Sequence, residues 1–167
     1  MSIKNTNTRI GTSKNLETGG TYDLLMISYP DGFPEGRITF DLGNTPRKIT
    51  GVQKVAQTFV KTLLTSKGSD VIYPLKGTTF LSVASGSNII QNDTLLYSEL
   101  ITAVKDAEDQ VKRTLNTVGT DTSSMLNRVD IAGLDVSQDS VVMYITVQTM
   151  DGLTANVAVP FPELDLN

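Results

Sequence analysis

Residues 141–159 carry the pattern that most restricts the fold of this chain of 167 residues. Apolar side chains alternate along both halves of the segment, at Val141, Met143, Ile145, Val147, Leu153, Ala155, Val157 and Val159. A period of two is typical of a β-strand with one buried face, and Asp151-Gly152 between the halves favours a tight turn. The pattern therefore predicts a β-hairpin that ends at Pro160. Two strands alone are marginally stable in water, and residues 128–132 are the expected third strand.

A helical period of about 3.6 residues replaces this alternation in the middle of the chain. It first runs from Val52 to Leu64, and Gly68 is then expected as the left-handed cap of that helix. A second helix is predicted to start at Asn92, Asp93 or Thr94. Its apolar stripe comprises Tyr97, Leu100, Ile101, Val104, Ala107, Val111, Leu115 and Val118. The stripe is longer than a small sheet can cover, so we expect one end to meet the chain's own sheet and another part to meet a neighbouring subunit. A wholly internal stripe fits the pattern equally well.

The segments around these elements give weaker signals. Residues 69–78 contain Pro74 and Gly77, which favour a loop, and we expect Val71, Tyr73 and Leu75 to pack it against the domain. Residues 24–29 and 37–40 are strand-like runs separated by Pro-Asp-Gly and Pro-Glu-Gly turns, and they predict an irregular hairpin. The first 20 residues are polar. They suit either a disordered tail or an arm that becomes ordered on a partner.

The predicted architecture is α+β, with two main helices packed on a small, mostly antiparallel sheet and an extended N-terminal arm. Residues 1–36 are expected to form the arm and the irregular hairpin. Residues 37–167 are expected to form the α+β domain. The predicted helices and hairpin both fall in the second part.

The absence of His and Cys excludes most common catalytic machinery, including imidazole bases, thiol nucleophiles and Cys-ligated metal sites. A carboxylate glycosidase would need two acids in one cleft, and Glu35 with Asp41, or Glu99 with a loop Asp, are the candidates. Asp130, Asp135 and Asp139 lack the spacing of a calcium loop. We therefore expect no catalytic residue, no metal and no cofactor.

Negative charge is concentrated in the C-terminal third of the chain. Residues 121–167 contain seven acidic residues and a single cation, Arg128, which argues against nucleic-acid binding by this third. No window approaches the roughly 18 apolar residues of a membrane span, and the start has no apolar stretch of signal-peptide length. We expect a product made in the cytoplasm that binds neither a membrane nor a nucleic acid.

Four short motifs occur in a recognisable order within residues 37–161. They are Phe40-Asp41-Leu42-Gly43, Gly51-Val52-Gln53-Lys54-Val55-Ala56-Gln57, Leu63-Leu64-Thr65-Ser66-Lys67-Gly68-Ser69 and Tyr73-Pro74-Leu75-Lys76-Gly77-Thr78. With the long helix and closing hairpin that follow, this order resembles the baseplate wedge and sheath-initiator family of contractile phage tails. Relatives of that family occur in type VI secretion systems, and some members are labelled lysozyme-like.

The resemblance implies two docking sites. The family's central Glu-Pro-Arg signature corresponds to Leu126-Asn127-Arg128, of which only Arg128 matches. In the family this segment docks on the helical core bundle of the other wedge subunits. The implied surface combines it with part of the long helix, at Tyr97, Leu100 and Val104. A local ion pair of Arg128 with Asp130 or Asp121 is the alternative role.

The closing hairpin resembles the terminal domain of the sheath subunit, so the resemblance implies strand exchange with the first sheath ring. The residues expected to receive the sheath strand are Leu153, Ala155, Val157 and Val159. The expected function is a non-enzymatic baseplate subunit of the virion tail that initiates sheath assembly. Its expected partners are the wedge subunits and the sheath protein, with the tail tube or hub as a candidate for the arm. A lysozyme-like cell-wall glycosidase and an adaptor that binds a helical partner remain as alternatives.

Overall fold

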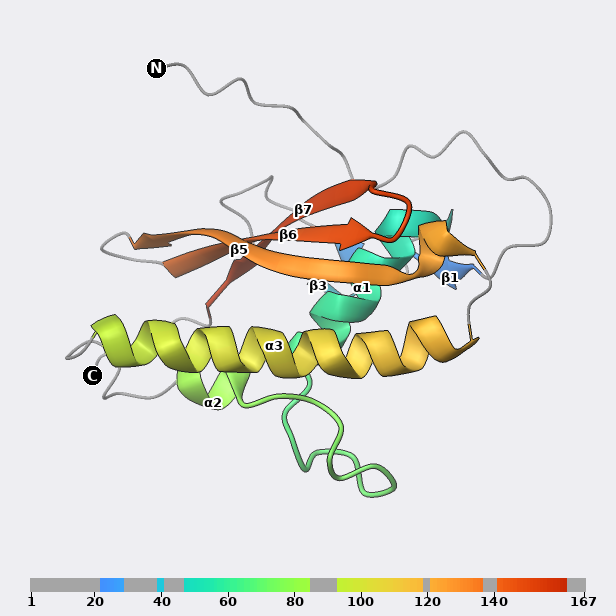
Figure 1. Ribbon diagram of the computed structural model, residues 1–167. Helices are drawn as coiled ribbons and strands as arrows, with labels where there is room; N and C mark the ends of the chain where they lie inside the picture. The colour runs from blue at the N-terminus through green and yellow to red at the C-terminus, as the bar shows by residue number, and fades with distance from the viewer. Residues whose placement is uncertain are drawn as a thin grey trace, which may run out of the picture.

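The computed structural model describes residues 22–28, 39–40, 47–84, 93–118, 121–136 and 141–161. Figure 1 shows an α+β fold in which a twisted sheet lies over a long helix, as the sequence predicted. The helices are α1 (Gly51–Leu63), α2 (Phe80–Ala84) and α3 (Asp93–Val118), with a 3-10 turn at Thr122–Ser124. The strands are β1 (Asp23–Leu24), β2 (Ile27–Ser28), β3 (Thr39–Phe40), β4 (Lys48–Ile49), β5 (Leu126–Val136), β6 (Val141–Thr149) and β7 (Thr154–Pro160).

The main sheet has the order β5-β6-β7, and both pairings are antiparallel. The β6–β7 hairpin is confirmed with the predicted turn, in which Gly152 has a φ of 87°. The third strand is also confirmed, although it spans 11 residues instead of the predicted five. Its length is accommodated by two register irregularities, between Leu126 and Arg128 and between Ile131 and Gly133.

Two helices cover one face of this sheet. α1 packs on β6 and β7, α3 packs on β5 and α1, and the short α2 packs on α3 (Figure 1). The inward side chains of the hairpin form the sheet's share of the core, with Met143, Val147 and Val159 all fully buried. Burial of apolar area between these layers is the main stabilising term, at about 25 cal/mol for each Å² removed from water.

The two long helices lie where the periodicity placed them. α1 ends at Leu63, and its cap residue Leu64 keeps a right-handed φ of −84°. The expected left-handed cap at Gly68 is therefore wrong. Gly68 does adopt a φ of 86°, but it does so in the turn that follows, where the Ser69 N–H donates to the Ser66 carbonyl.

Most of the stripe of α3 is internal. Leu100, Ala103, Val104, Ala107 and Val111 are buried, whereas Tyr97 and Ile101, near the start of the helix, are 46% and 43% exposed. The helix therefore has a core-facing middle and an apolar N-terminal end that contacts solvent. Whether that end meets a neighbouring subunit stays a prediction.

The hairpin expected near the N-terminus is confirmed in its paired residues, because Ile27 lies opposite Phe40 in the β2–β3 ladder. The β1–β4 pairing joins Asp23 to Ile49 and adds a second attachment. Ile27 is 4% exposed and belongs to the core of the domain. Residues 22–28 are thus part of the packed structure, while the polar arm predicted for the first 20 residues lies outside the described residues.

The loop at 69–78 is confirmed, but the packing predicted for it is wrong. Val71, Tyr73 and Leu75 are 95%, 65% and 79% exposed. Figure 1 shows this loop extending beyond α3 on the side away from the sheet. The apolar residues lie in a segment without a regular period, so no face of it is turned towards the core.

Candidate functional site

The outer edge of β7 is the main-chain surface where the sheet can pair with another chain. Among the described strands, β7 is terminal and pairs with β6 alone. The Thr149 N–H donates to the Leu153 carbonyl at 2.9 Å, so these two residues form a hydrogen-bonded pair. Hydrogen-bonded and non-bonded pairs alternate along an antiparallel ladder. The N–H and C=O groups of Thr154 and Asn156 therefore point away from β6, towards the outer edge.

The residues predicted to receive the sheath strand alternate with Thr154 and Asn156, so their main-chain groups point the other way, towards β6. Ala155, Val157 and Val159 lie opposite Val147, Ile145 and Met143, so their main-chain groups bond to β6. Their side chains face the core and are at most 9% exposed. Leu153 precedes β7 and closes the turn. The edge is thus carried by the alternate residues Thr154 and Asn156, which sequence reasoning missed because it followed the apolar side chains.

The side chains of these two edge residues are exposed and polar. Asn156 accepts a hydrogen bond through Oδ1 from the Thr146 hydroxyl at 2.9 Å, which holds its side chain over β6. The side chain therefore does not fold back onto its own main-chain N–H. Ala158 is the next residue in this alternation, but it is fully buried. The candidate edge therefore consists of Thr154 and Asn156.

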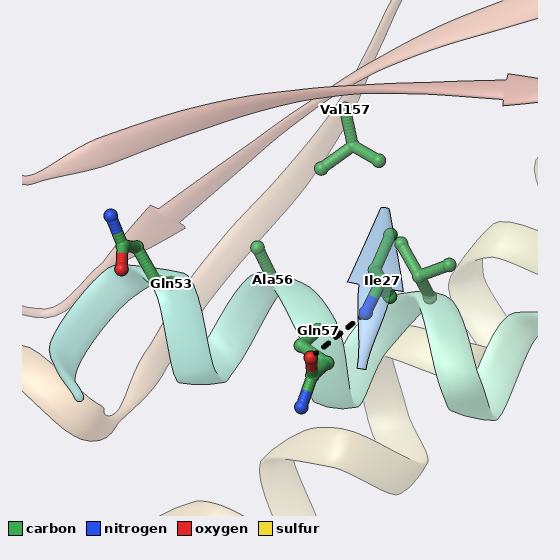
Figure 2. A pocket seen from close by; sticks show the side chains of 6 residues that line it. Ile27, Gln53, Ala56, Gln57 and Val157 are labelled. Atoms are coloured by element: carbon green, nitrogen blue, oxygen red, sulfur yellow. Dashed lines mark hydrogen bonds between the residues drawn. The ribbon is translucent and has the colours of Figure 1, made fainter. Parts of the chain in front are cut away.

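A small pocket lies below β7, between this strand and α1 (Figure 2). Its lining is mainly apolar, and it consists of Ile27, Gln53, Ala56, Gln57, Val60 and Val157. Val157 reaches it from the sheet, Ile27 enters it from β2, and the other four residues come from α1. The pocket thus adjoins the strand whose edge is the candidate docking site.

Gln57 is the best-bonded side chain around this pocket. It is 2% exposed, and its Nε2 donates to the Leu24 carbonyl at 2.7 Å and to Asp23 Oδ2 at 2.9 Å. Its Oε1 accepts from the Met26 N–H at 2.6 Å, with a longer contact from the Ile27 N–H at 3.4 Å. One carboxamide therefore binds an extended segment twice, by accepting from a backbone N–H and by donating to a backbone carbonyl.

Gln53 lies one turn earlier on α1 and has different surroundings. Its Oε1 is buried, and within the part of the chain that the structure describes it has no hydrogen-bond partner. A buried carbonyl oxygen left in this state costs about 1 to 3 kcal/mol, so such groups are rare in folded proteins. This atom is the one unsatisfied buried side-chain oxygen or nitrogen that the described residues contain.

Three of the six residues predicted to dock on the wedge bundle are inside the chain's own core. Leu100, Val104 and Leu126 are 1%, 4% and 0% exposed. Leu126 is further fixed by Asn116, whose Oδ1 accepts from its N–H and whose Nδ2 donates to its carbonyl, both at 3.0 Å. These three residues stabilise the fold and are not surface contacts.

The other three residues are exposed but do not form one surface. Arg128 and Asn127 lie at the start of β5, near the C-terminal end of α3. Tyr97 lies at the opposite end of α3, nineteen residues before Asn116, which corresponds to about 28 Å of helix. The Arg128 Nε is 3.1 Å from Asp130 Oδ2, and both side chains are more than half exposed. The local ion pair considered for Arg128 is therefore present in this structure.

Of the acids that the sequence suggested for a glycosidase, Glu99 is exposed on α3. Glu35 and Asp41 lie outside the described residues. The pKa of Asp121 is lowered, because the Ser123 hydroxyl and then the Ser123 N–H donate hydrogen bonds to its charged form. No group of three metal-binding side chains occurs among the described residues. No helix in the same residues has the length and hydropathy needed to cross a bilayer.

Comparison of the chain with protein-family models, with curated proteins and with solved structures finds no match. The family resemblance of the short motifs therefore stays an expectation. The candidate functional features of the described residues are the edge of β7, the pocket beneath it and the exposed residues at the start of β5.

Proposed function

We propose that this protein is a structural subunit of a contractile-tail baseplate wedge that initiates sheath assembly by β-strand exchange. The observation that carries the proposal is the outer edge of β7, where the main-chain groups of Thr154 and Asn156 point away from the sheet. The order of the short sequence motifs supports the choice of machine. Under this proposal the sheath protein supplies the strand and no chemical reaction is catalysed.

The edge suits strand addition because it is already held in the required geometry. β7 is bonded along its length to β6, and its inward side chains Val157 and Val159 are anchored in the core. An incoming strand therefore loses its own conformational freedom while the receiving strand loses little more. Main-chain pairing of this kind gives affinity without depending on the edge side chains.

Docking on the wedge bundle would use the exposed end of β5. The Arg128 side chain is 62% exposed, and the exposed Asn127 precedes it in β5. A guanidinium binds a carboxylate or the carbonyl end of a helix through several parallel hydrogen bonds, which Lys cannot reproduce. In the proposed contact Arg128 exchanges its exposed partner Asp130 for such a group on the bundle.

The strand-exchange step is tested by Asn156→Pro. This substitution removes an N–H that points to the outer edge, where the β6–β7 ladder does not use it, and proline is tolerated at such edge positions. We expect a folded protein with a thermal midpoint within a few degrees of the wild type, and baseplates that no longer polymerise sheath. Sheath assembly is measured by electron microscopy of baseplates reconstituted with purified sheath protein.

Two companion variants make this test specific. Asn156→Ala keeps the N–H and removes only the side-chain bond to Thr146, so baseplates carrying it should polymerise sheath normally. Val157→Pro removes an N–H of the internal ladder and should unfold the hairpin, so it cannot report on the edge. Normal sheath assembly on baseplates with Asn156→Pro would show that the proposed function is wrong.

A further inference from the structure

Two glutamines line the pocket below β7 from adjacent turns of α1 (Figure 2). Residues four apart on a helix lie on the same side of it, so Gln53 and Gln57 face the same region of the molecule. Gln57 shows what a carboxamide does there, because it donates to the carbonyl of Leu24 and accepts from the N–H of Met26. Two hydrogen bonds of this kind hold the extended segment 22–28 against the helix.

Gln53 has the same chemistry but no segment to bind. The Oε1 of Gln53 is buried and has no hydrogen-bond partner within the described residues. Folding normally avoids such an arrangement, because the oxygen loses water without gaining a donor. A segment that covered this turn of α1 would remove the cost.

The position of Gln53 indicates which segment could cover this turn of α1. Gln53 lines the same pocket as Val157 of β7, and the N-terminal end of α1 approaches the 3-10 turn at Thr122–Ser124, which also contacts β6. Gln53 therefore lies near Val157, the residue that follows Asn156 in β7. A strand added to the edge of β7 would lie beside the turn of α1 that carries Gln53, as residues 24–27 lie beside the turn that carries Gln57.

We propose that the Gln53 carboxamide is a binding subsite for the main chain of the segment that adds to β7. It rests on the proposed function, since the sheath protein supplies that segment. Nε2 donates to a carbonyl of the incoming strand and Oε1 accepts from one of its N–H groups, as in the contacts of Gln57 with Leu24 and Met26. Rotation about the soft terminal χ angle of Gln53 turns both atoms towards the strand.

The lining of the pocket limits which side chain the incoming strand can place beside this subsite. Ala56, Val60 and Val157 give it an apolar lining, and Ile27 already occupies part of it. A charged residue beside this lining would lose its hydration without a partner. The incoming segment is therefore an extended strand whose residue facing α1 is uncharged.

The inference is tested by Gln53→Met, which keeps the length of the side chain and removes both polar atoms. The affinity of the full-length protein for purified sheath protein is measured by titration calorimetry. We expect it to fall about five- to tenfold, which corresponds to the loss of one or two ordinary hydrogen bonds. The thermal midpoint of the free protein should stay the same or rise, because the variant no longer buries an unsatisfied oxygen.

Gln57→Met is the matched control, since its carboxamide is used within the chain. Its thermal midpoint should fall. A fall of the same size for Gln53→Met would mean that Gln53 has a structural role in the free protein and would overturn the inference. A second readout is the side-chain amide signal of Gln53 in nuclear magnetic resonance spectra, which should shift when sheath protein is added.

Failure of the inference and failure of the proposed function give different results. If Asn156→Pro abolishes sheath binding while Gln53→Met binds sheath as the wild type does, the edge is correct and the Gln53 subsite is wrong. If the wild-type protein does not bind sheath protein, or if Asn156→Pro binds it normally, both the proposed function and the Gln53 subsite are wrong.

Discussion

The β6–β7 hairpin and the loop between α1 and α2 are both rich in apolar residues, yet they place them in opposite environments. In the hairpin, Ile145 and Val157 are 1% exposed. In the loop, Val71 and Ile72 are 95% and 79% exposed. The difference shows that apolar content does not determine burial by itself. A regular backbone period is needed to turn every second side chain to the same face.

The loop is nevertheless a well-bonded structure at its base. Thr78 is buried, its N–H donates to the Thr65 carbonyl at 2.8 Å, and its hydroxyl donates to the Leu63 carbonyl at 2.7 Å. Gln110 of α3 binds both main-chain groups of Gly77, at 2.9 Å to the N–H and 2.8 Å to the carbonyl. Polar contacts thus hold the loop, whereas apolar packing holds the hairpin.

The largest effect is expected for a cavity in the hairpin. Ile145→Ala removes a side chain that is 1% exposed and packed among α1 and the sheet, so the free energy of unfolding should fall by about 3 to 4 kcal/mol. Chemical denaturation measures this loss as a lower denaturant midpoint, with the slope of the free energy against denaturant unchanged. A loss below about 1 kcal/mol would mean that the hairpin is not the main apolar contribution of the sheet.

The second effect compares the glycines of the two regions. Gly77 has a φ of 93°, and a Cβ there would clash with the Thr65 carbonyl oxygen. Gly152 in the hairpin turn has a φ of 87° but open space around its Cβ position. Gly77→Ala should therefore cost about 3 kcal/mol and Gly152→Ala about 1 kcal/mol. Equal losses in thermal denaturation would show that the close approach of residues 65 and 77 is absent.

The third effect concerns the polar contact that holds the loop. Gln110→Ala leaves the Gly77 N–H without its partner and should lower the free energy of unfolding by about 1 to 2 kcal/mol. Amide hydrogen exchange in residues 70–78 should accelerate more than exchange in β6. Gln148→Ala is the control, because within the described residues the one hydrogen bond of that half-buried side chain is a long contact of 3.4 Å with Asn127. Unchanged exchange in the loop of Gln110→Ala would contradict this account of its anchoring.

The smallest effect is expected at the exposed end of the loop. Ile72→Ala removes a side chain that is 79% exposed, so the free energy of unfolding should change by less than about 0.5 kcal/mol. The same type of truncation at Ile145 is therefore several times more costly. A loss above about 1 kcal/mol, measured in the same denaturation experiment, would mean that the loop packs on the domain in solution.

The sequence allowed the regular parts of the fold to be predicted, because amphipathic periods report burial directly. The hairpin, α1 and α3 are all found near their expected bounds. The two-residue strands β1 and β4 have no period to detect, and α2 is too short for one. Their positions depend on contacts between distant residues, such as the edge-to-face packing of Phe80 on Phe161 at a centroid distance of 5.4 Å.

The candidate site was predictable to the strand but not to the residue. The alternation of apolar side chains located β7, but a side-chain pattern does not reveal which main-chain groups point outwards. That requires the bonding of the turn, which is set by the Thr149–Leu153 pair. Neither the hydrogen bonds of Gln57 to residues 23–27 nor the unpartnered Oε1 of Gln53 has a sequence signal, because Gln is common on the polar side of a helix.

The three-residue connection between Thr149 and Leu153 has a consequence for how this protein can evolve. An insertion or deletion of one residue there would exchange the roles of the odd and even positions of β7. The apolar side chains would then leave the core, or the outward amides would belong to different residues. Substitutions at Thr154 and Asn156 leave the backbone amides in place. Under the proposed strand exchange, binding is therefore expected to tolerate substitutions at Thr154 and Asn156 far better than any change in the length of the turn.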